Sequence, residues 1–301
     1  MTTRIVVPSG VGDAYWCFTK MESMIEKGKI STPVVIYPWR PVFNNYDNHR
    51  GKEMVESIPW MEFGDYIIDN TILPHFRTGN PITPNITSVS QSNISEYDYF
   101  MHFNPLLERG TNMDDILPEY KTNWYIDMEY EKEDLLDPNE KYIVAFFTDY
   151  GMFKEWDRKF DKMEVGRLLY QIHKQTGYKI VLMGQSPQHD NYYTRLLGAM
   201  GGSLGSFTIN MTGKTDFIGV LNLIRNAKLV IGHCAGGSTI FSTILKKPTI
   251  MYWDRDTFHN KGFWVNTCPP DSLNNWYFPF DIADAKSSVT RVLRIIKEIG
   301  I

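Results

Sequence analysis

Two α/β domains, each with a parallel sheet that helices cover on both faces, are the fold class that this sequence of 301 residues predicts. Short apolar strands alternate with amphipathic helices, a pattern typical of parallel sheets. The alternation occurs twice, with a charged break between the two series. We expect two Rossmann-like domains that face each other across a cleft, with ligands at the carboxyl ends of the strands.

In the first half, strands are expected at 4–8, 34–37, 66–69 and 97–103. A helix at 14–27 follows the first strand, and Gly28 is expected to end it. The segment 39–50 is polar and aromatic and is interpreted as a loop. The segment 71–93 is interpreted as a long irregular excursion, and excursions of that length are often functional.

The domain boundary is expected in the charged run from Glu129 to Glu140, which contains a proline. We therefore assign residues 1–137 to the first domain and 138–301 to the second. The final helix, about 284–299, is a candidate to pack back on the first domain.

In the second half, the alternation restarts. Strands are expected at 142–147, 179–183, 206–211, 229–231 and 249–253, and helices at 163–176, 191–200, 216–226, 240–245 and 284–299. Gly177 is expected to end the first of these helices.

A turn with three glycines separates the strands 229–231 and 249–253. Its residues Gly236, Gly237, Ser238 and Thr239 are expected at a helix N-terminus. Backbone N–H groups and the helix dipole bind phosphate at such a place without a cationic side chain. The same residues also suit an ordinary tight turn before a capped helix, and the turn by itself leaves both interpretations open.

Composition limits the classes of function. A net charge of -4 argues against a general polyanion-binding surface and leaves room for a local basic patch. No apolar run approaches the roughly 20 residues of a membrane span, so we expect no integral membrane segment. With no signal peptide and three cysteines that lack metal-binding spacing, we expect a cytoplasmic protein with reduced thiols.

Three segments carry a resemblance to a known family. Gly12-Asp13 follows the first strand, Lys154-Glu155-Trp156-Asp157 follows the first strand of the second half, and Met211-Thr212-Gly213 leads through a helix to Gly232 and Gly236. The sequence resembles glycosyltransferases of the GT-B architecture, nearest the heptosyltransferase group, glycosyltransferase family 9. Three positions depart from that group: Cys234 stands where it has Asp, Thr239 where it has His, and Asp157 where it has Pro.

The resemblance implies transfer of a sugar from a nucleotide-diphosphate-sugar donor to a hydroxyl acceptor. We expect the transfer to proceed with inversion and without a metal, and the sequence leaves retention open as the alternative. The resemblance places the general base at Asp13, which is also expected to face the cleft just past the first strand. The alternative is that Asp13 caps the helix N-terminus, where its carboxylate would be a poor base.

Donor contacts are expected mainly from turns of the second half. The candidates are Gly12, Thr148, Lys154, Gly184, Gln185, Thr212, Gly213, His233, Gly236, Gly237, Ser238 and Thr239. Each has an alternative: Lys154 suits a solvated loop, His233 suits packing at a strand end, and the glycines suit ordinary turns.

The acceptor side is expected in first-half loops, where Arg40, Arg50, His75 and Arg77 are interleaved with aromatic residues. Such a mixture suits a glycan-type or phosphorylated sugar acceptor, and it also suits DNA with a flipped base. A solvated loop surface is the alternative.

We expect no cofactor and no metal site. Asp254 and Asp256 have the carboxylate spacing that GT-A transferases use for a divalent cation, but an ordinary loop with Arg255 reaching the cleft is favoured. Two other functions stay open: a nucleotide-sugar epimerase of the same architecture, and a non-catalytic nucleotide-sugar-binding subunit. The sequence also leaves the oligomeric state open.

Overall fold

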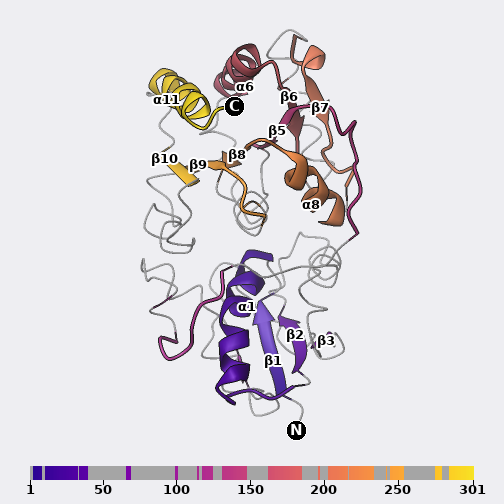
Figure 1. The fold of residues 1–301 in the computed structure, drawn as a ribbon, viewed down its shortest axis with the longest axis vertical. Helices are drawn as coiled ribbons and strands as arrows, with labels where there is room; N and C mark the ends of the chain where they lie inside the picture. Colours follow the sequence, from indigo (N-terminus) through magenta and orange to yellow (C-terminus); the bar gives the residue numbers. More distant parts are fainter. Residues whose placement is uncertain are drawn as a thin grey trace, which may run out of the picture. The chain divides into compact units, whose positions relative to one another are not determined.

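The chain forms two compact units, Met1–Tyr130 and Glu131–Ile301, in a computed structural model (Figure 1). The residues that the structure describes are 3–8, 11–32, 34–39, 66–68, 99–100, 114, 117–124, 131–147, 162–184, 196, 203–215, 217–233, 242, 245–253, 275–279 and 285–301. Each unit contains one sheet whose described strands are all parallel.

The sheet of the first unit has the order β3-β2-β1-β4. Its strands are β1 (Thr3–Pro8), β2 (Val34–Trp39), β3 (Tyr66–Ile68) and β4 (Tyr99–Phe100). All four strands were expected from their apolar patterns. Trp39 was expected in a loop, but it pairs with Pro8 as the last residue of the β1–β2 ladder.

Helix α1 (Val11–Glu26) begins directly after β1, three residues earlier than the sequence predicts. Its end is as expected. Gly28 has a φ of 67° and donates its N–H to the carbonyl of Ile25 at 2.9 Å, while Lys29 N–H reaches the carbonyl of Met24 at 2.8 Å. This is the Schellman arrangement, in which a left-handed glycine satisfies the last carbonyls of a helix.

The sheet of the second unit has the order β10-β9-β8-β5-β6-β7. Its strands are β5 (Tyr142–Phe146), β6 (Lys179–Leu182), β7 (Thr208–Asn210), β8 (Val230–His233), β9 (Thr249–Trp253) and β10 (Asn275–Pro279). Counted from β5, this is the order 3-2-1-4-5-6 of dinucleotide-binding folds. Chain progression therefore reverses between the neighbouring strands β5 and β8.

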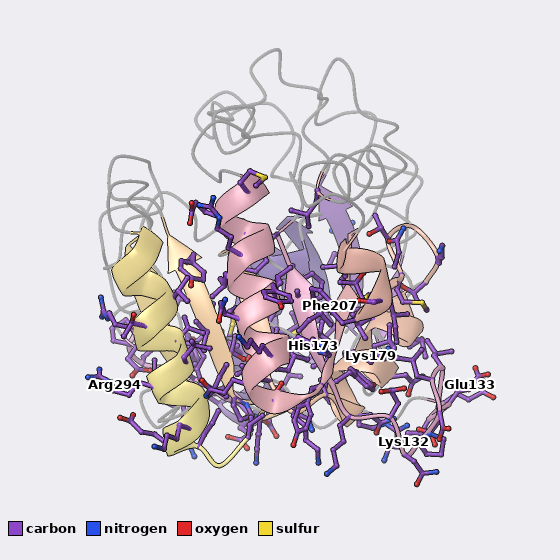
Figure 2. All side chains as sticks on the ribbon, turned by 90° about the horizontal axis from the view of Figure 1, so that it is seen from above. Lys132, Glu133, His173, Lys179, Phe207 and Arg294 are labelled. Atoms are coloured by element: carbon purple, nitrogen blue, oxygen red, sulfur yellow. The ribbon has the colours of Figure 1, made fainter. Side chains whose placement is uncertain are left out.

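Helices cover both faces of this sheet. On one face, α6 (Lys162–Thr176) and α11 (Ala285–Glu298) lie side by side and share a buried apolar cluster with the strands (Figure 2). The other face is covered by α8 (Phe217–Asn226). The hydroxyl of Tyr142 on β5 donates to the carbonyl of Leu223 in this helix at 2.9 Å. The predicted fold of doubly covered parallel sheets is confirmed. The final helix, considered a candidate to pack on the first domain, buries Val292 and Ile296 in the core of the second unit.

The end of α6 is fixed by a glycine and by an aromatic stack. Gly177 has a φ of 72° and ends the helix as the sequence predicts. The ring of His173 stacks on Phe207, which precedes β7, with 4.6 Å between centroids and an interplanar angle of 12° (Figure 2). The Nδ1 atom of His173 lies 2.8 Å from the carbonyl oxygen of Tyr178, so Nδ1 carries the proton and donates it.

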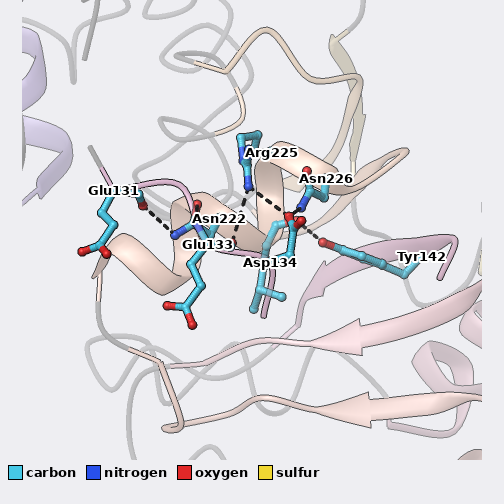
Figure 3. Close-up of polar contacts among 8 residues, drawn as sticks. Glu131, Glu133, Asp134, Tyr142, Asn222, Arg225 and Asn226 are labelled. Atoms are coloured by element: carbon cyan, nitrogen blue, oxygen red, sulfur yellow. Dashed lines mark hydrogen bonds and ion pairs between the residues drawn. The ribbon is translucent and has the colours of Figure 1, made fainter. Parts of the chain in front are cut away.

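The charged run expected to form a linker is held against α8 in its described part (Figure 3). The side chain of Asn222, 2% exposed, donates to the carbonyl of Glu131 at 3.1 Å and accepts the N–H of Glu133 at 3.2 Å. Asn226 and Arg225 both donate to the carboxylate of Asp134, at 2.6 and 3.1 Å. Residues 131–134 therefore behave as part of the second unit rather than as a free connection.

Burial raises the pKa of Tyr142 to about 12, with a further contribution from the negative charge of Asp134 that Arg225 partly offsets. The unfolded chain ionises this phenol near pH 10 while the folded chain keeps it neutral, so its contribution to stability is lost between about pH 10 and 12. Relative to Tyr142→Phe, the wild type should lose up to about 3 kcal/mol of unfolding free energy over that interval.

Urea unfolding of both proteins at pH 8, 10 and 11.5 measures this loss. At pH 8 the wild type should be the more stable by about 1 kcal/mol, because its hydroxyl is hydrogen-bonded. A difference between the two proteins that does not change with pH would contradict the assignment.

Candidate functional site

The carboxyl edge of the second sheet is where the fold places a ligand site. In open parallel sheets, ligands bind beyond the strand ends at the point where the strand order reverses. Here that point lies between β5 and β8, which end at Phe146 and His233. On the other side of β5, the pairing with β6 continues one residue past the end of β6, because Met183 donates its N–H to the carbonyl of Ala145 at 3.0 Å.

Gly232 lies at this reversal and pairs with Phe146 of β5 and Met251 of β9. The sequence interpretation placed Gly232 in a turn, whereas it belongs to β8. A Cβ at this position would lie 2.3 Å from the carbonyl oxygen of Phe146, a distance that real Cβ atoms do not show. Glycine is therefore required by the close approach of the neighbouring strand and not by a turn.

The predicted nucleoside-side residues Gly184 and Gly213 are brought together. Gly213, with a φ of 67°, donates its N–H to the carbonyl of Gly184 at 2.7 Å, and Met211 donates to Leu182 at 3.0 Å. These bonds extend the β6–β7 ladder beyond its last residues. The backbone at Gly184 therefore lies next to the turn that contains Gly213, at the carboxyl edge of the sheet.

Asn210, which the sequence interpretation missed, closes the turn after β7. Its side-chain oxygen accepts the N–H of Thr212 at 3.0 Å, and its carbonyl accepts the amine of Lys214 at 2.8 Å. An Asn two residues before a Thr-Gly pair, as in Asn210-Met211-Thr212-Gly213, suits an Asx turn and could have identified it. Thr212 is 4% exposed, and its buried hydroxyl has no hydrogen-bond partner in the described part of the chain.

Gly12 and Asp13 lie in the first turn of α1, directly after the central strand β1. The strand order of this sheet also reverses beside β1, which pairs with β2 on one side and β4 on the other. Because the helix begins at Val11, Asp13 is its third residue and not its N-cap, although it still lies in the first turn, where acidic side chains interact with the helix N-terminus.

Several candidates lie outside the described residues. His233 ends β8, and only its backbone is described. The remaining candidates beyond the described ranges are Arg40, Arg50, His75, Arg77, Thr148, Lys154, Gln185, Gly236, Gly237, Ser238, Thr239, Asp254 and Asp256. Within the described ranges, no three His, Cys, Asp or Glu side chains form a group that could hold a metal ion. No helix among these residues has the length and apolar character to cross a bilayer.

Two parallel α/β sheets in separate units are the architecture of the GT-B fold. Solved structures share this fold. The glycosyl transferase family 9 protein from Veillonella parvula DSM 2008 superposes with a TM-score of 0.62 at 10% identity, over 99% of this chain and 96% of that one. The E. coli ADP-heptose lps heptosyltransferase II gives a TM-score of 0.60 at 12% identity, over 99% and 98%.

The E. coli heptosyltransferase WaaC, solved with ADP, gives a TM-score of 0.58 at 13% identity over 100% of both chains. The family model described as glycosyltransferase family 9 (heptosyltransferase) matches residues 98–251, more than half of the chain. This chain therefore belongs to glycosyltransferase family 9 and is a glycosyltransferase. The comparison with curated proteins finds no match for the sequence.

Proposed function

We propose that this chain transfers a sugar from a nucleotide-diphosphate donor to a hydroxyl acceptor with inversion, without a metal, and with Asp13 as the general base. The match to the family over residues 98–251 is the observation that carries the transfer of a sugar, and the resemblance at Gly12-Asp13 motivates the assignment of the base. The position of Asp13 in the first turn of α1 supports it from the structure.

In the proposed reaction, the Asp13 carboxylate takes the proton of the acceptor hydroxyl as its oxygen attacks the anomeric carbon. The bond from that carbon to the diphosphate oxygen breaks, and the nucleoside diphosphate leaves with the bonding electron pair. Charge builds on the leaving diphosphate, so the donor side needs positive potential. We assign that role to the backbone N–H groups of Gly236–Thr239, with Thr148 and Lys154.

For the nucleoside, we assign the surface formed by Gly184, Gly213 and Thr212. Solved structures of the E. coli heptosyltransferase WaaC, which shares the fold, contain ADP and ADP-2-deoxy-2-fluoro heptose. ADP-heptose is therefore the first donor to test. Cys234 and Thr239 replace residues of the heptosyltransferase pattern, and for that reason other bases and sugars belong in the same panel.

A panel of nucleotide sugars tests the proposal. The expected result is release of nucleoside diphosphate from one donor class, undiminished in excess EDTA, together with a rise in melting temperature with the matching nucleoside diphosphate. Release that stops in EDTA and returns with a divalent cation would contradict the metal-independent mechanism.

Product analysis separates the alternatives. Conversion of the donor sugar without transfer would indicate an epimerase, and tight binding without turnover would indicate a binding subunit. Either outcome would contradict the proposed transfer.

A further inference from the structure

A segment from late in the first unit lies along α1. We call residues 119–124 the strap. Asn123 donates its N–H to the carbonyl of Thr19 at 2.6 Å, and Lys121 donates its N–H to the Ser23 hydroxyl at 2.9 Å. In addition, Tyr15 hydrogen-bonds the Trp124 carbonyl, Lys20 donates to the Tyr120 carbonyl at 2.8 Å, and Lys27 hydrogen-bonds the Glu119 carbonyl.

These contacts follow one stripe of the helix. Tyr15, Thr19, Ser23 and Lys27 are spaced by four residues, so they lie above one another on one face. Their partners run in the opposite direction along the strap, from Trp124 back to Glu119. The strap therefore contacts α1 along three successive turns, which fixes the helix along its axis as well as around it.

The anchoring side chains are removed from solvent. Tyr15 is 1% exposed, Lys20 is 0% exposed and Ser23 is 5% exposed. Buried polar side chains of this kind need partners, and strap backbone groups supply one for each of these three side chains, while the backbone carbonyl of Thr19 accepts the N–H of Asn123. These directional hydrogen bonds add to the apolar packing of α1 in fixing its register against the strap.

The register of α1 matters because its first turn carries Asp13. A general base acts only within hydrogen-bond reach of the proton that it removes, and a displacement of about 1 Å can cost about 10²-fold in rate. Tyr15 lies two residues from Asp13, at the end of the strap contacts nearest the site.

We propose that Tyr15, with Lys20 and Ser23, is a positioning residue that holds the Asp13 turn through the strap. This inference rests on the proposed function of Asp13. A positioning role of Tyr15 differs from a purely structural one in its effect on the kinetics. Loosening the strap lowers turnover and leaves donor affinity unchanged, because the donor contacts are assigned mainly to the second unit.

The test uses the full chain and the variant Tyr15→Phe, which keeps the ring and removes only the hydroxyl. Its matched control is Tyr142→Phe, since Tyr142 is also buried and donates its hydroxyl to a backbone carbonyl, in the second unit. Turnover is measured as nucleoside diphosphate release from ADP-heptose, or from the panel donor that reacts fastest, and donor Kd by calorimetry.

For Tyr15→Phe we expect kcat to fall about 10-fold with an unchanged donor Kd, while Tyr142→Phe keeps both values. Ser23→Ala should show the same pattern as Tyr15→Phe to a smaller extent. Near-UV circular dichroism reports the folded fraction of each variant, and a fall in kcat that only follows this fraction would overturn the inference.

The decisive measurement places Tyr15→Phe in an Asp13→Asn background. If Tyr15 acts through Asp13, Tyr15→Phe should not lower kcat further in the Asp13→Asn background, because the effects of coupled residues are not additive. An equal 10-fold loss in both backgrounds would overturn positioning of Asp13. Wild-type turnover in the single variant Asp13→Asn would instead overturn the proposed base itself, and that result is obtained independently of Tyr15.

Discussion

Asp13→Asn should lower turnover on the order of 10³-fold, within the range that loss of a general base produces. The substitution keeps the size and hydrogen-bonding shape of the side chain and removes its capacity to accept a proton. Donor affinity should change little, because the donor is assigned mainly to turns of the second unit. Nucleoside diphosphate release under saturating donor gives kcat, and calorimetry gives the donor Kd.

A charge-matched control is available on the same helix. Glu26 lies exposed in the last turn of α1, so Glu26→Gln removes an equal charge at the opposite end. It should keep wild-type turnover. If Asp13→Asn and Glu26→Gln have equal activity, Asp13 is not the base, and the family resemblance at this position carries no catalytic meaning.

Gly232→Ala should destabilise the second unit by about 3 kcal/mol or more, the upper range for overpacking a well-packed interior. The added Cβ would meet the backbone carbonyl of Phe146, and a backbone atom in the middle of a sheet cannot rotate away as a side chain can. β5 and β8 would have to separate where the strand order reverses. We therefore expect weaker nucleotide binding as well as lower stability.

Urea unfolding measures the stability, with Gly205→Ala as the control. Gly205 lies exposed in the 3₁₀ turn Ser203–Ser206, and a Cβ there meets nothing within 4 Å. That substitution should change the unfolding free energy by less than about 1 kcal/mol. Equal midpoints for Gly232→Ala and the wild type would show that the sheet accommodates the methyl group.

The sequence pattern predicted those strands and helix ends that depend on residues close together in the chain. Thr249–Trp253 is an uninterrupted apolar run and forms β9 over those residues. Gly28 and Gly177 both take the left-handed conformation that ends a helix. β10 was missed because Asn275–Pro279 mixes polar, aromatic and proline residues, which an edge strand tolerates.

Features with causes elsewhere in the fold could not be predicted in this way. Gly232 resembled a turn residue because the atom that excludes a side chain belongs to Phe146, on another strand. The strap contacts were missed for a similar reason: Tyr15 and Trp124 are 109 positions apart, and the acceptor is a backbone carbonyl that every residue type possesses. For the donor side, the sequence identified that Gly184 and Gly213 follow neighbouring strands, but not the Asn210 side chain that closes their turn.

The path of the strap has a consequence for recombining this enzyme with its relatives. A helix near the amino terminus is hydrogen-bonded to a segment about a hundred positions later in the sequence, so the two segments should be exchanged together. Chimaeras that exchange the amino-terminal half upstream of Glu119 would combine a helix from one parent with a strap from the other, and the buried side chains of Tyr15 and Lys20 would then have to reach a strap backbone whose path other residues determine. A crossover point between Trp124 and Glu131 keeps each helix with its own partner segment.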